Sequence, residues 1–222
     1  MESATVRGPD VARSAETEPA SARSGIWAPA DPAPLGLAGF ALTTFVLSMF
    51  NAHLVSSAGE PVVLGLALAY GGVAQLLAGM WEFRTGNTFG AVAFTSYGAF
   101  WISFWALVTF FVKDIPAAHA GAAIGLYLWA WGIFTTYMFV ASLRTTGAVA
   151  LVFALLAATY ILLGIGNSGG HETIIKWGGY VGIATAAAAW YASFAAVVNF
   201  TFKRTMLPTV PLAARGVPGA NQ

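Results

Sequence analysis

Residues 70–105, YGGVAQLLAGMWEFRTGNTFGAVAFTSYGAFWISFW, decide how this chain folds. They form two long apolar runs joined by the polar turn RTGN at 84–87, which predicts a hairpin of two helices. Polar side chains interrupt both runs, namely Gln75 and Glu82 in the first and Thr95, Ser96 and Tyr97 in the second. Because an uncompensated polar group inside a bilayer is costly, we expect these polar side chains to serve the passage of a small polar solute.

The composition indicates an integral membrane protein. The chain has 222 residues, of which 58% are hydrophobic and 9% are charged, whereas a soluble domain carries about 25% charged residues. The net charge of +1 gives no strong attraction for nucleic acid. The chain has no cysteine, which excludes disulfides, thiolate metal sites and cysteine nucleophiles.

Six apolar runs predict an all-α integral membrane fold with six transmembrane helices. The runs are 35–54, a second that follows Pro61 and ends near Phe83, then 88–112, 120–143, 148–166 and 174–202. Each is close to the roughly 20 residues that cross a bilayer, and none alternates in polarity as a barrel strand would. We expect a disordered tail at 1–30, a six-helix transmembrane domain at 31–204 and a C-terminal tail at 205–222.

An even number of spans places both termini on one side of the membrane, and the basic residues select that side. One set of loops and tails holds eight of the ten: Arg7, Arg13, Arg23, Arg84, Arg144, Lys203, Arg204 and Arg215. The other side holds Lys113 and Lys176. The basic side is the cytoplasmic one, so we expect a multi-pass protein of the cell membrane with both termini in the cytoplasm.

Several polar residues have local structural interpretations. Asp31 and Glu60 each precede a proline and are expected to cap helices. Asn87 is expected to cap the helix that begins near Thr88, where free N–H groups form a weak anion site. Hydroxyls inside membrane helices bond by default to their own backbone. This applies to Thr43, Thr44, Thr95 and Ser96.

Gln75 and Glu82 continue a face of small residues that includes Gly71 and Gly79. Small residues at this spacing let membrane helices approach closely. Gln75 is expected either to bond a neighbouring helix or to line a pore. Glu82 is the one acid inside any predicted span, which favours a role in proton coupling. Pairing with Arg84 or capping is the structural alternative.

The tryptophans, Trp101 among them, are interpreted as interface or lipid-facing side chains.

Known catalytic patterns are missing from the sequence. It contains no HExxH, no clustered aspartates, no GxSxG and no P-loop. The three histidines lie on separate loops without carboxylate partners, so we expect no metal site, and no cofactor. An enzyme is therefore the weaker functional class.

Short motifs spread along the chain carry a family resemblance. They are DPAPLGL at 31–37, YGG at 70–72 with Gln75, Ala78, Gly79 and Glu82, GNTFG at 86–90, AFTSYG at 93–98, GIGN at 164–167 and RTMLP at 204–208. In this order they resemble the acetate uptake transporter family, also called the succinate–acetate permeases. The resemblance covers about residues 30–210. Asp31 departs from the family's Asn, and its charge would repel an anion at the inner mouth.

The resemblance implies six transmembrane helices around a central pathway in each protomer, and a homohexamer of such protomers. It implies uptake of acetate, and in some members of succinate or other short carboxylates, by proton-coupled or channel-like transport. Phe40, Tyr97 and Leu156 map onto the family's hydrophobic constriction, with Ala189 nearby influencing which acids pass. The candidates for the polar pathway or coupling are Thr43, Thr44, Gln75, Glu82, Asn87, Thr88, Thr95, Ser96 and Asn167. The expected partners are acetate, a proton and the lipid bilayer.

Two other functions fit a six-span membrane protein. The first is a passive channel for small neutral solutes such as urea or amides. The second is a non-transporting accessory subunit that assembles with a partner, although the short inner loops do not favour a signalling domain.

Overall fold

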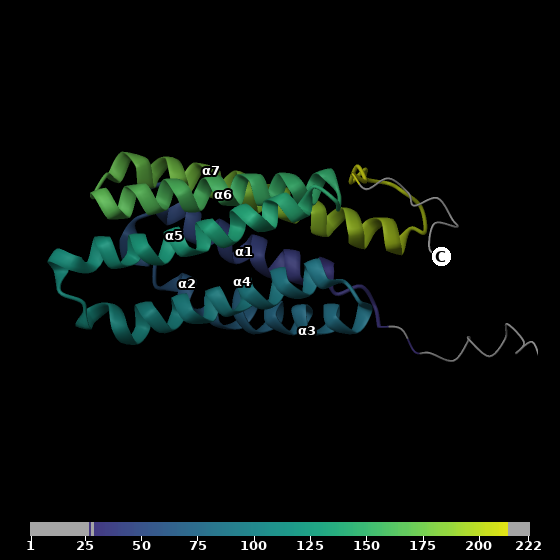
Figure 1. Ribbon diagram of the computed structural model, residues 1–222, viewed down its shortest axis with the longest axis horizontal. Helices are drawn as coiled ribbons and strands as arrows, with labels where there is room; N and C mark the ends of the chain where they lie inside the picture. Colours follow the sequence, from purple (N-terminus) through teal and green to yellow (C-terminus); the bar gives the residue numbers. More distant parts are fainter. Residues whose placement is uncertain (1–26, 28, 213–222) are drawn as a thin grey trace, which may run out of the picture.

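Six helical spans run up and down through the described part of the chain (Figure 1). The computed structural model describes residue 27 and residues 29–212, so most of the expected N-terminal tail and residues 213–222 lie outside the described residues. The spans are Ala33–Asn51, Val62–Thr85, Thr88–Asp114, Ala117–Ser142, Gly147–Gly169 and Glu172–Thr201. All six are long and apolar enough to cross a membrane, which confirms the predicted all-α fold.

Four of the spans are single α-helices, and two change helix type along their length. The single helices are α1 (Ala33–Asn51), α5 (Ala117–Ser142), α6 (Gly147–Gly169) and α7 (Glu172–Thr201). The second span consists of α2 (Val62–Leu68), a π-helical segment η3 (Ala69–Ala74) and α3 (Gln75–Thr85). The third consists of α4 (Thr88–Ala106), a π-helical η4 (Leu107–Phe111) and a short η5 (Val112–Asp114). Such π-segments are rare and occur frequently at functional sites.

The helices form two groups that share α1. α5, α6 and α7 lie along one side of the bundle, and α2, α3 and α4 along the other (Figure 1). α1 packs against α7 on one side and against η3 and α3 on the other. The start of α1 and the end of α7 lie at the same end of the bundle, where the α3–α4 and α5–α6 turns also lie. The opposite end, formed by the other loops, is called the loop end here.

The helix caps expected from the sequence at Asp31 and Asn87 are present in the structure, whereas the one at Glu60 is not. Asp31 Oδ1 accepts the Ala33 N–H at 2.9 Å, and Asn87 Oδ1 accepts the Gly90 N–H at 3.0 Å. Gly86 ends α3 at φ 78°, in the left-handed region where glycine costs least. The expectation that Glu60 caps α2 is wrong: Pro61 precedes this helix, and no side chain caps its start. The Glu60 backbone carbonyl accepts the Val63 N–H instead, at 2.9 Å.

The glycines of the small-residue face allow close packing, as expected. A methyl group at Gly71 would meet the Thr43 hydroxyl and the Trp101 ring, and one at Gly79 would meet Thr95. The second span therefore lies directly against α1 and α4. This close approach holds Gln75 and Glu82 inside the protein, where each exposes 1% of its surface.

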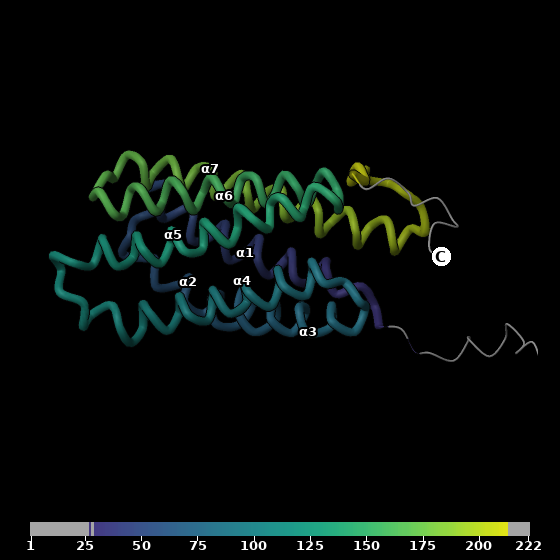
Figure 2. The backbone as a smooth tube through the Cα atoms, in the orientation of Figure 1, coloured from purple at the N-terminus to yellow at the C-terminus, as the bar shows by residue number. Residues whose placement is uncertain are grey.

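A strap at residues 203–212 folds back from the end of α7 onto the start of α6, as the yellow end of the tube shows in Figure 2. The Gly147 and Ala148 N–H groups donate to the carbonyls of Val210 and Thr209 at 2.7 and 3.2 Å. These are donors that a helix start leaves without an intrahelical partner. The strap therefore completes the start of α6.

The side chain of Asn199 anchors this strap. Its Oδ1 accepts the Met206 and Leu207 N–H groups at 2.7 and 3.0 Å, and its Nδ2 donates to the Leu207 carbonyl at 2.8 Å. Tyr191 adds a hydrogen bond from its hydroxyl to the Pro208 carbonyl at 2.6 Å. The anchoring bonds all come from the last three turns of α7.

We expect Asn199→Ala to release the strap, because it removes all three of these hydrogen bonds. The free energy of unfolding should fall by about 1–3 kcal/mol, seen as a lower melting temperature in detergent. Trypsin should also cut faster after Lys203 and Arg204. Thr201→Ala is the control, since Thr201 is exposed on the same helix end. Equal cleavage rates in the two variants would show that Asn199 does not hold the strap.

Candidate functional site

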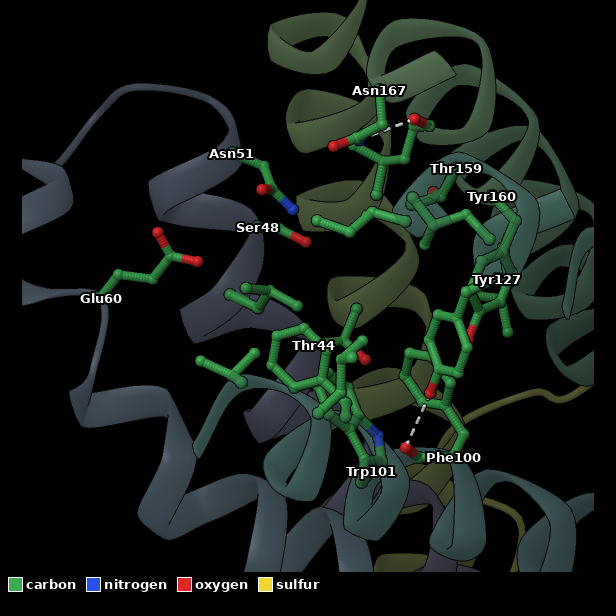
Figure 3. A pocket seen from close by; sticks show the side chains of 18 of the residues that line it. Thr44, Ser48, Asn51, Glu60, Phe100, Trp101, Tyr127, Thr159, Tyr160 and Asn167 are labelled. Carbon is green, nitrogen blue, oxygen red and sulfur yellow. Dashed lines mark hydrogen bonds between the residues drawn. The ribbon is translucent and has the colours of Figure 1, made fainter. Parts of the chain in front are cut away.

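A cavity of about 310 Å³ enters the bundle from the loop end. Side chains of α1, α4 with its extension, α5 and α6 line it, and Glu60 stands at its rim (Figure 3). Its walls are largely apolar, for example at Leu47, Phe104 and Leu163. Its polar lining residues are Thr44, Ser48, Asn51, Glu60, Trp101, Tyr127, Thr159, Tyr160 and Asn167. An apolar pocket with a few placed polar groups is typical of a site for a small solute.

The polar residues of α1 form a single stripe. Thr44, Ser48 and Asn51 follow Phe40 at spacings of four, four and three residues, so all four lie on one helix face. The α6 side contributes Asn167, whose Nδ2 donates to the Leu163 carbonyl at 2.8 Å. The Asn167 amide is thus held in place at the loop end.

Glu60 places a carboxyl group at the rim of the cavity. Its side chain remains partly open to solvent, yet neighbouring protein removes enough water to raise the pKa of the carboxyl above its usual value. The group therefore gains a proton at a higher pH than a free glutamate would. Burial thus favours the neutral form of the carboxyl at the rim.

Phe40 and Leu156 form the floor of the cavity, and Tyr97 lies behind them. Phe40 and Leu156 both line the cavity, whereas Tyr97 does not. The Phe40 and Tyr97 rings lie 5.8 Å apart between centroids. None of the three exposes more than 4% of its surface, and all belong to one buried cluster that also holds Ala189. The structure thus brings together the four residues expected at a constriction, with the floor closed.

The hydroxyl of Tyr97 is already engaged. It lies 2.9 Å from the Thr135 hydroxyl, which donates its own proton to the Trp131 carbonyl at 2.8 Å. A hydroxyl has one proton to donate, so Tyr97 must donate to Thr135. In this conformation Tyr97 offers a solute its ring and a lone pair, and its proton points to α5.

The other expected polar residues fall into separate places. Thr44 and Asn167 line the cavity, whereas Thr43 bonds back to the Gly39 carbonyl at 2.9 Å. Asn87 acts as the helix cap, and Thr88 beside it is exposed. Ser96 is half-buried and does not line the cavity.

Five buried polar atoms in residues 29–212 have no hydrogen-bond partner, and all belong to α1, α3 or α4. They are Thr44 Oγ1, Gln75 Oε1, Glu82 Oε1, Thr95 Oγ1 and Trp101 Nε1. Glu82 Oε2 accepts the Thr85 hydroxyl at 3.0 Å. Its expected alternative partner, Arg84, is exposed, and no ion pair between the two is present. Thr95 and Glu82 lie between α3 and α4, where Thr95 is next to Gly79 and the Glu82 carboxyl is next to Gly90, whereas Gln75 lies against Gly39 of α1. None of the three lines the cavity, and we call them together the polar seam.

Sequence reasoning missed Trp101 and most of the cavity wall. The interpretation of Trp101 as a lipid-facing or interface residue is wrong, because it exposes 2% of its surface and lines the cavity. Its spacing of four residues from Tyr97 was the available signal, since the two share a helix face. The stripe of Thr44, Ser48 and Asn51 carried a similar signal.

Comparison with known proteins gives concordant matches. Residues 15–214 match the model of the GPR1/FUN34/yaaH family. The succinate-acetate/proton symporter SatP of Escherichia coli K12 is 40% identical over 179 residues, which cover 81% of this chain and 94% of SatP. Acetate permease A of Emericella nidulans is 42% identical over 194 residues, covering 81% of this chain and 65% of that one. Ammonia transport outward protein 2 of Saccharomyces cerevisiae is 43% identical over 175 residues, covering 77% of this chain and 62% of that protein.

A solved structure supports the same relationship. The structure of the bacterial acetate channel SatP matches with a TM-score of 0.77 and 39% identity, covering 82% of this chain and 99% of the other. The resemblance to the acetate uptake transporter family is thereby confirmed. This chain belongs to the GPR1/FUN34/yaaH family.

Proposed function

We propose that this protein transports acetate and related short carboxylates across the cell membrane. The observation that carries the proposal is a cavity of about 310 Å³ that penetrates a six-span fold and ends on Phe40 and Leu156. The names of the relatives, a symporter, a permease and a channel for these acids, support it. All three names describe transport proteins. We therefore propose a transporter and not an enzyme.

The closed floor explains how such a protein could discriminate among solutes. A carboxylate is ionised at neutral pH and loses much hydration energy in an apolar constriction. Polar groups along the cavity can replace part of its water shell before it meets Phe40 and Leu156. Ala189 is fully buried beside this cluster, so a larger residue there would push into the constriction. We propose that these residues, with Tyr97, decide which acids pass.

Proton coupling is the second part of the proposal. The relatives are named both as a proton symporter and as a channel. The buried seam of Gln75, Thr95 and Glu82 provides polar groups outside the solute cavity, and Glu82 is its one ionisable member. A proton could therefore be exchanged at Glu82 while the carboxylate passes the constriction.

The basic residues and the helix order support a proposal for the arrangement in the membrane. We propose that the helix ends near Arg84 and Arg144 face the cytoplasm, as both termini do, so that the cavity opens to the outside. The transmembrane domain would span 31–204 in the lipid bilayer of the cell membrane, and the protomers would form the homohexamer implied by the family resemblance.

Ammonium transport is the second candidate function. A carboxyl group at the cavity rim, as at Glu60, attracts a cation when it is ionised, and one relative is named for ammonia transport. Donor atoms without acceptors in the cavity, such as Trp101 Nε1, favour the carboxylate instead.

The test is uptake of labelled acetate into liposomes that contain the purified chain. We expect uptake above that of empty liposomes, and a severalfold increase with an inward proton gradient. Uptake without any response to the gradient would favour a passive channel, and labelled urea would then be compared. Absence of flux for acetate, urea and methylammonium would favour an accessory subunit.

Leu156→Ala is expected to admit larger acids, because it removes bulk from the closed floor. The ratio of lactate to acetate uptake should rise roughly tenfold. Leu151→Ala is the matched control, since Leu151 lies on the same helix with 52% of its surface exposed. An unchanged ratio in folded Leu156→Ala would show that this side chain does not limit solute size.

Glu82→Gln is expected to abolish the response of acetate uptake to a proton gradient, because an amide cannot bind and release a proton. The amide oxygen can still accept the Thr85 hydroxyl, so the fold should persist. Exchange of labelled acetate at equal pH should therefore continue. Glu172→Gln, at an exposed position of α7, serves as the control. Full gradient dependence in Glu82→Gln would assign Glu82 a structural role.

A further inference from the structure

Thr85 is the exposed neighbour of the buried Glu82 carboxyl. Glu82 exposes 1% of its surface, so water has little direct access to it. Thr85 is the last residue of α3, and its side chain is exposed. Its hydroxyl oxygen lies 3.0 Å from Glu82 Oε2. The hydroxyl is therefore placed between the carboxyl and the protein surface, at the end of the bundle where α1 begins (Figure 1).

The Thr85 hydroxyl has two acceptors within hydrogen-bonding distance. The Glu82 backbone carbonyl is 2.9 Å away and Glu82 Oε2 is 3.0 Å away, but a hydroxyl has one proton to donate. When Glu82 is ionised, the hydroxyl donates to Oε2, and the carbonyl keeps the Asn87 N–H at 3.1 Å. When Glu82 is neutral, Oε2–H donates to the Thr85 oxygen and the hydroxyl donates to the carbonyl. Rotation of one hydroxyl proton thus keeps the two side chains bonded in both protonation states.

The other carboxyl oxygen faces the start of α4. A methyl group at Gly90 would lie 2.7 Å from Glu82 Oε1 and 2.6 Å from Asn87 Nδ2. Asn87 Oδ1 accepts the Gly90 N–H, which leaves Nδ2 as a donor beside the carboxyl. Glu82 Oε1 has no hydrogen-bond partner within the described residues. A small shift would pair Nδ2 with Oε1 once the acid is ionised, so the surroundings of the carboxyl suit both of its forms.

Few charged groups act on this carboxyl. Asp31, just before α1, is the acid that acts on it through space. Arg84, on the same helix, is exposed and forms no ion pair with it. Neither α1 nor α4 carries a charged residue along its length. Within residues 29–212, a proton can therefore leave or return to Glu82 without breaking an ion pair.

We infer that the Thr85 hydroxyl transfers protons between water at the α3–α4 turn and the Glu82 carboxyl, and holds that carboxyl in both protonation states. The inference rests on the proposed proton coupling and names the residue that connects it to one side of the membrane. A proton arriving from water binds Thr85 Oγ1 while the proton already on Oγ1 moves to Glu82 Oε2. The carboxylate becomes a neutral acid and the hydroxyl is regenerated; the reverse transfers release the proton.

The first test measures how uptake of labelled acetate into liposomes responds to an inward proton gradient. Thr85→Val keeps the shape of the side chain and removes the hydroxyl. The severalfold increase caused by the gradient should be lost in Thr85→Val and should return in Thr85→Ser. Exchange of labelled acetate at equal pH should be unchanged in both variants, whereas a purely structural defect would lower it as well.

Thr136→Val is the matched control for this test. Thr136 is also exposed, and its hydroxyl bonds a carbonyl of its own helix, that of Gly132, at 2.7 Å. It has no carboxyl as a partner in the described residues, so its removal should leave the gradient response intact.

Infrared spectroscopy tests the proton transfer without any transport. The carbonyl band of the protonated Glu82 carboxyl is assigned by its loss in Glu82→Gln. When the unmodified protein is transferred to D2O, this band should shift as deuterium replaces the proton. In Thr85→Val the shift should be slower by roughly tenfold or more, since a positioned proton-transfer group contributes at least that much. Thr85→Ser should exchange as the unmodified protein does.

The outcomes separate this inference from the function on which it rests. A Thr85→Val variant with the full gradient response and an unchanged exchange rate would overturn the inference. So would the absence of a protonated Glu82 band at every pH at which the protein is folded. If acetate uptake by the unmodified protein ignores the gradient, the proposed proton coupling is refuted by that result alone, and the exchange rate of the Glu82 carboxyl then decides the role of Thr85.

Discussion

The bilayer supplies no hydrogen bonds, so every polar group inside the six spans must find a partner within the protein or remain unpaired at a cost. Five of the eight buried serine and threonine hydroxyls meet this demand by bonding to a carbonyl of their own helix, as Thr43 does with Gly39. Within residues 29–212, the five buried polar atoms without a partner are confined to α1, α3 and α4. The cavity is nevertheless lined by α5 and α6 as well as by α1 and α4.

Tyr97 joins the two groups of helices at the floor of the cavity. Its ring packs against Phe40 of α1, Phe134 of α5 and Phe153 of α6, with centroids 5.8, 5.4 and 6.0 Å away. Its hydroxyl is fixed to Thr135. The Tyr97 ring is therefore packed against side chains from three other helices.

The solute cavity and the polar seam meet different side chains of α4. The cavity is lined from α4 by Trp101 and Phe104, whereas the seam faces α3 through Thr95. A carboxylate and a proton could thus use different surfaces of the same helix. One relative is named a proton symporter and another a channel. The same pore would fit both names, because a proton path beside the constriction is what would distinguish a symporter from a channel.

The sequence alone determined the six spans, because a run of about 20 apolar residues is a local property that lipid enforces. It also determined the caps at Asp31 and Asn87, which act within three residues of the chain. Only the tertiary structure decided which polar residues face the cavity. Thr44 and Gln75 are both polar residues well inside a span, yet Thr44 lines the cavity and Gln75 does not, because the neighbours of α1 and α3 set their surroundings. Trp101 and Glu60 were misinterpreted for the same reason: burial and proximity to a cavity depend on contacts between segments distant in sequence.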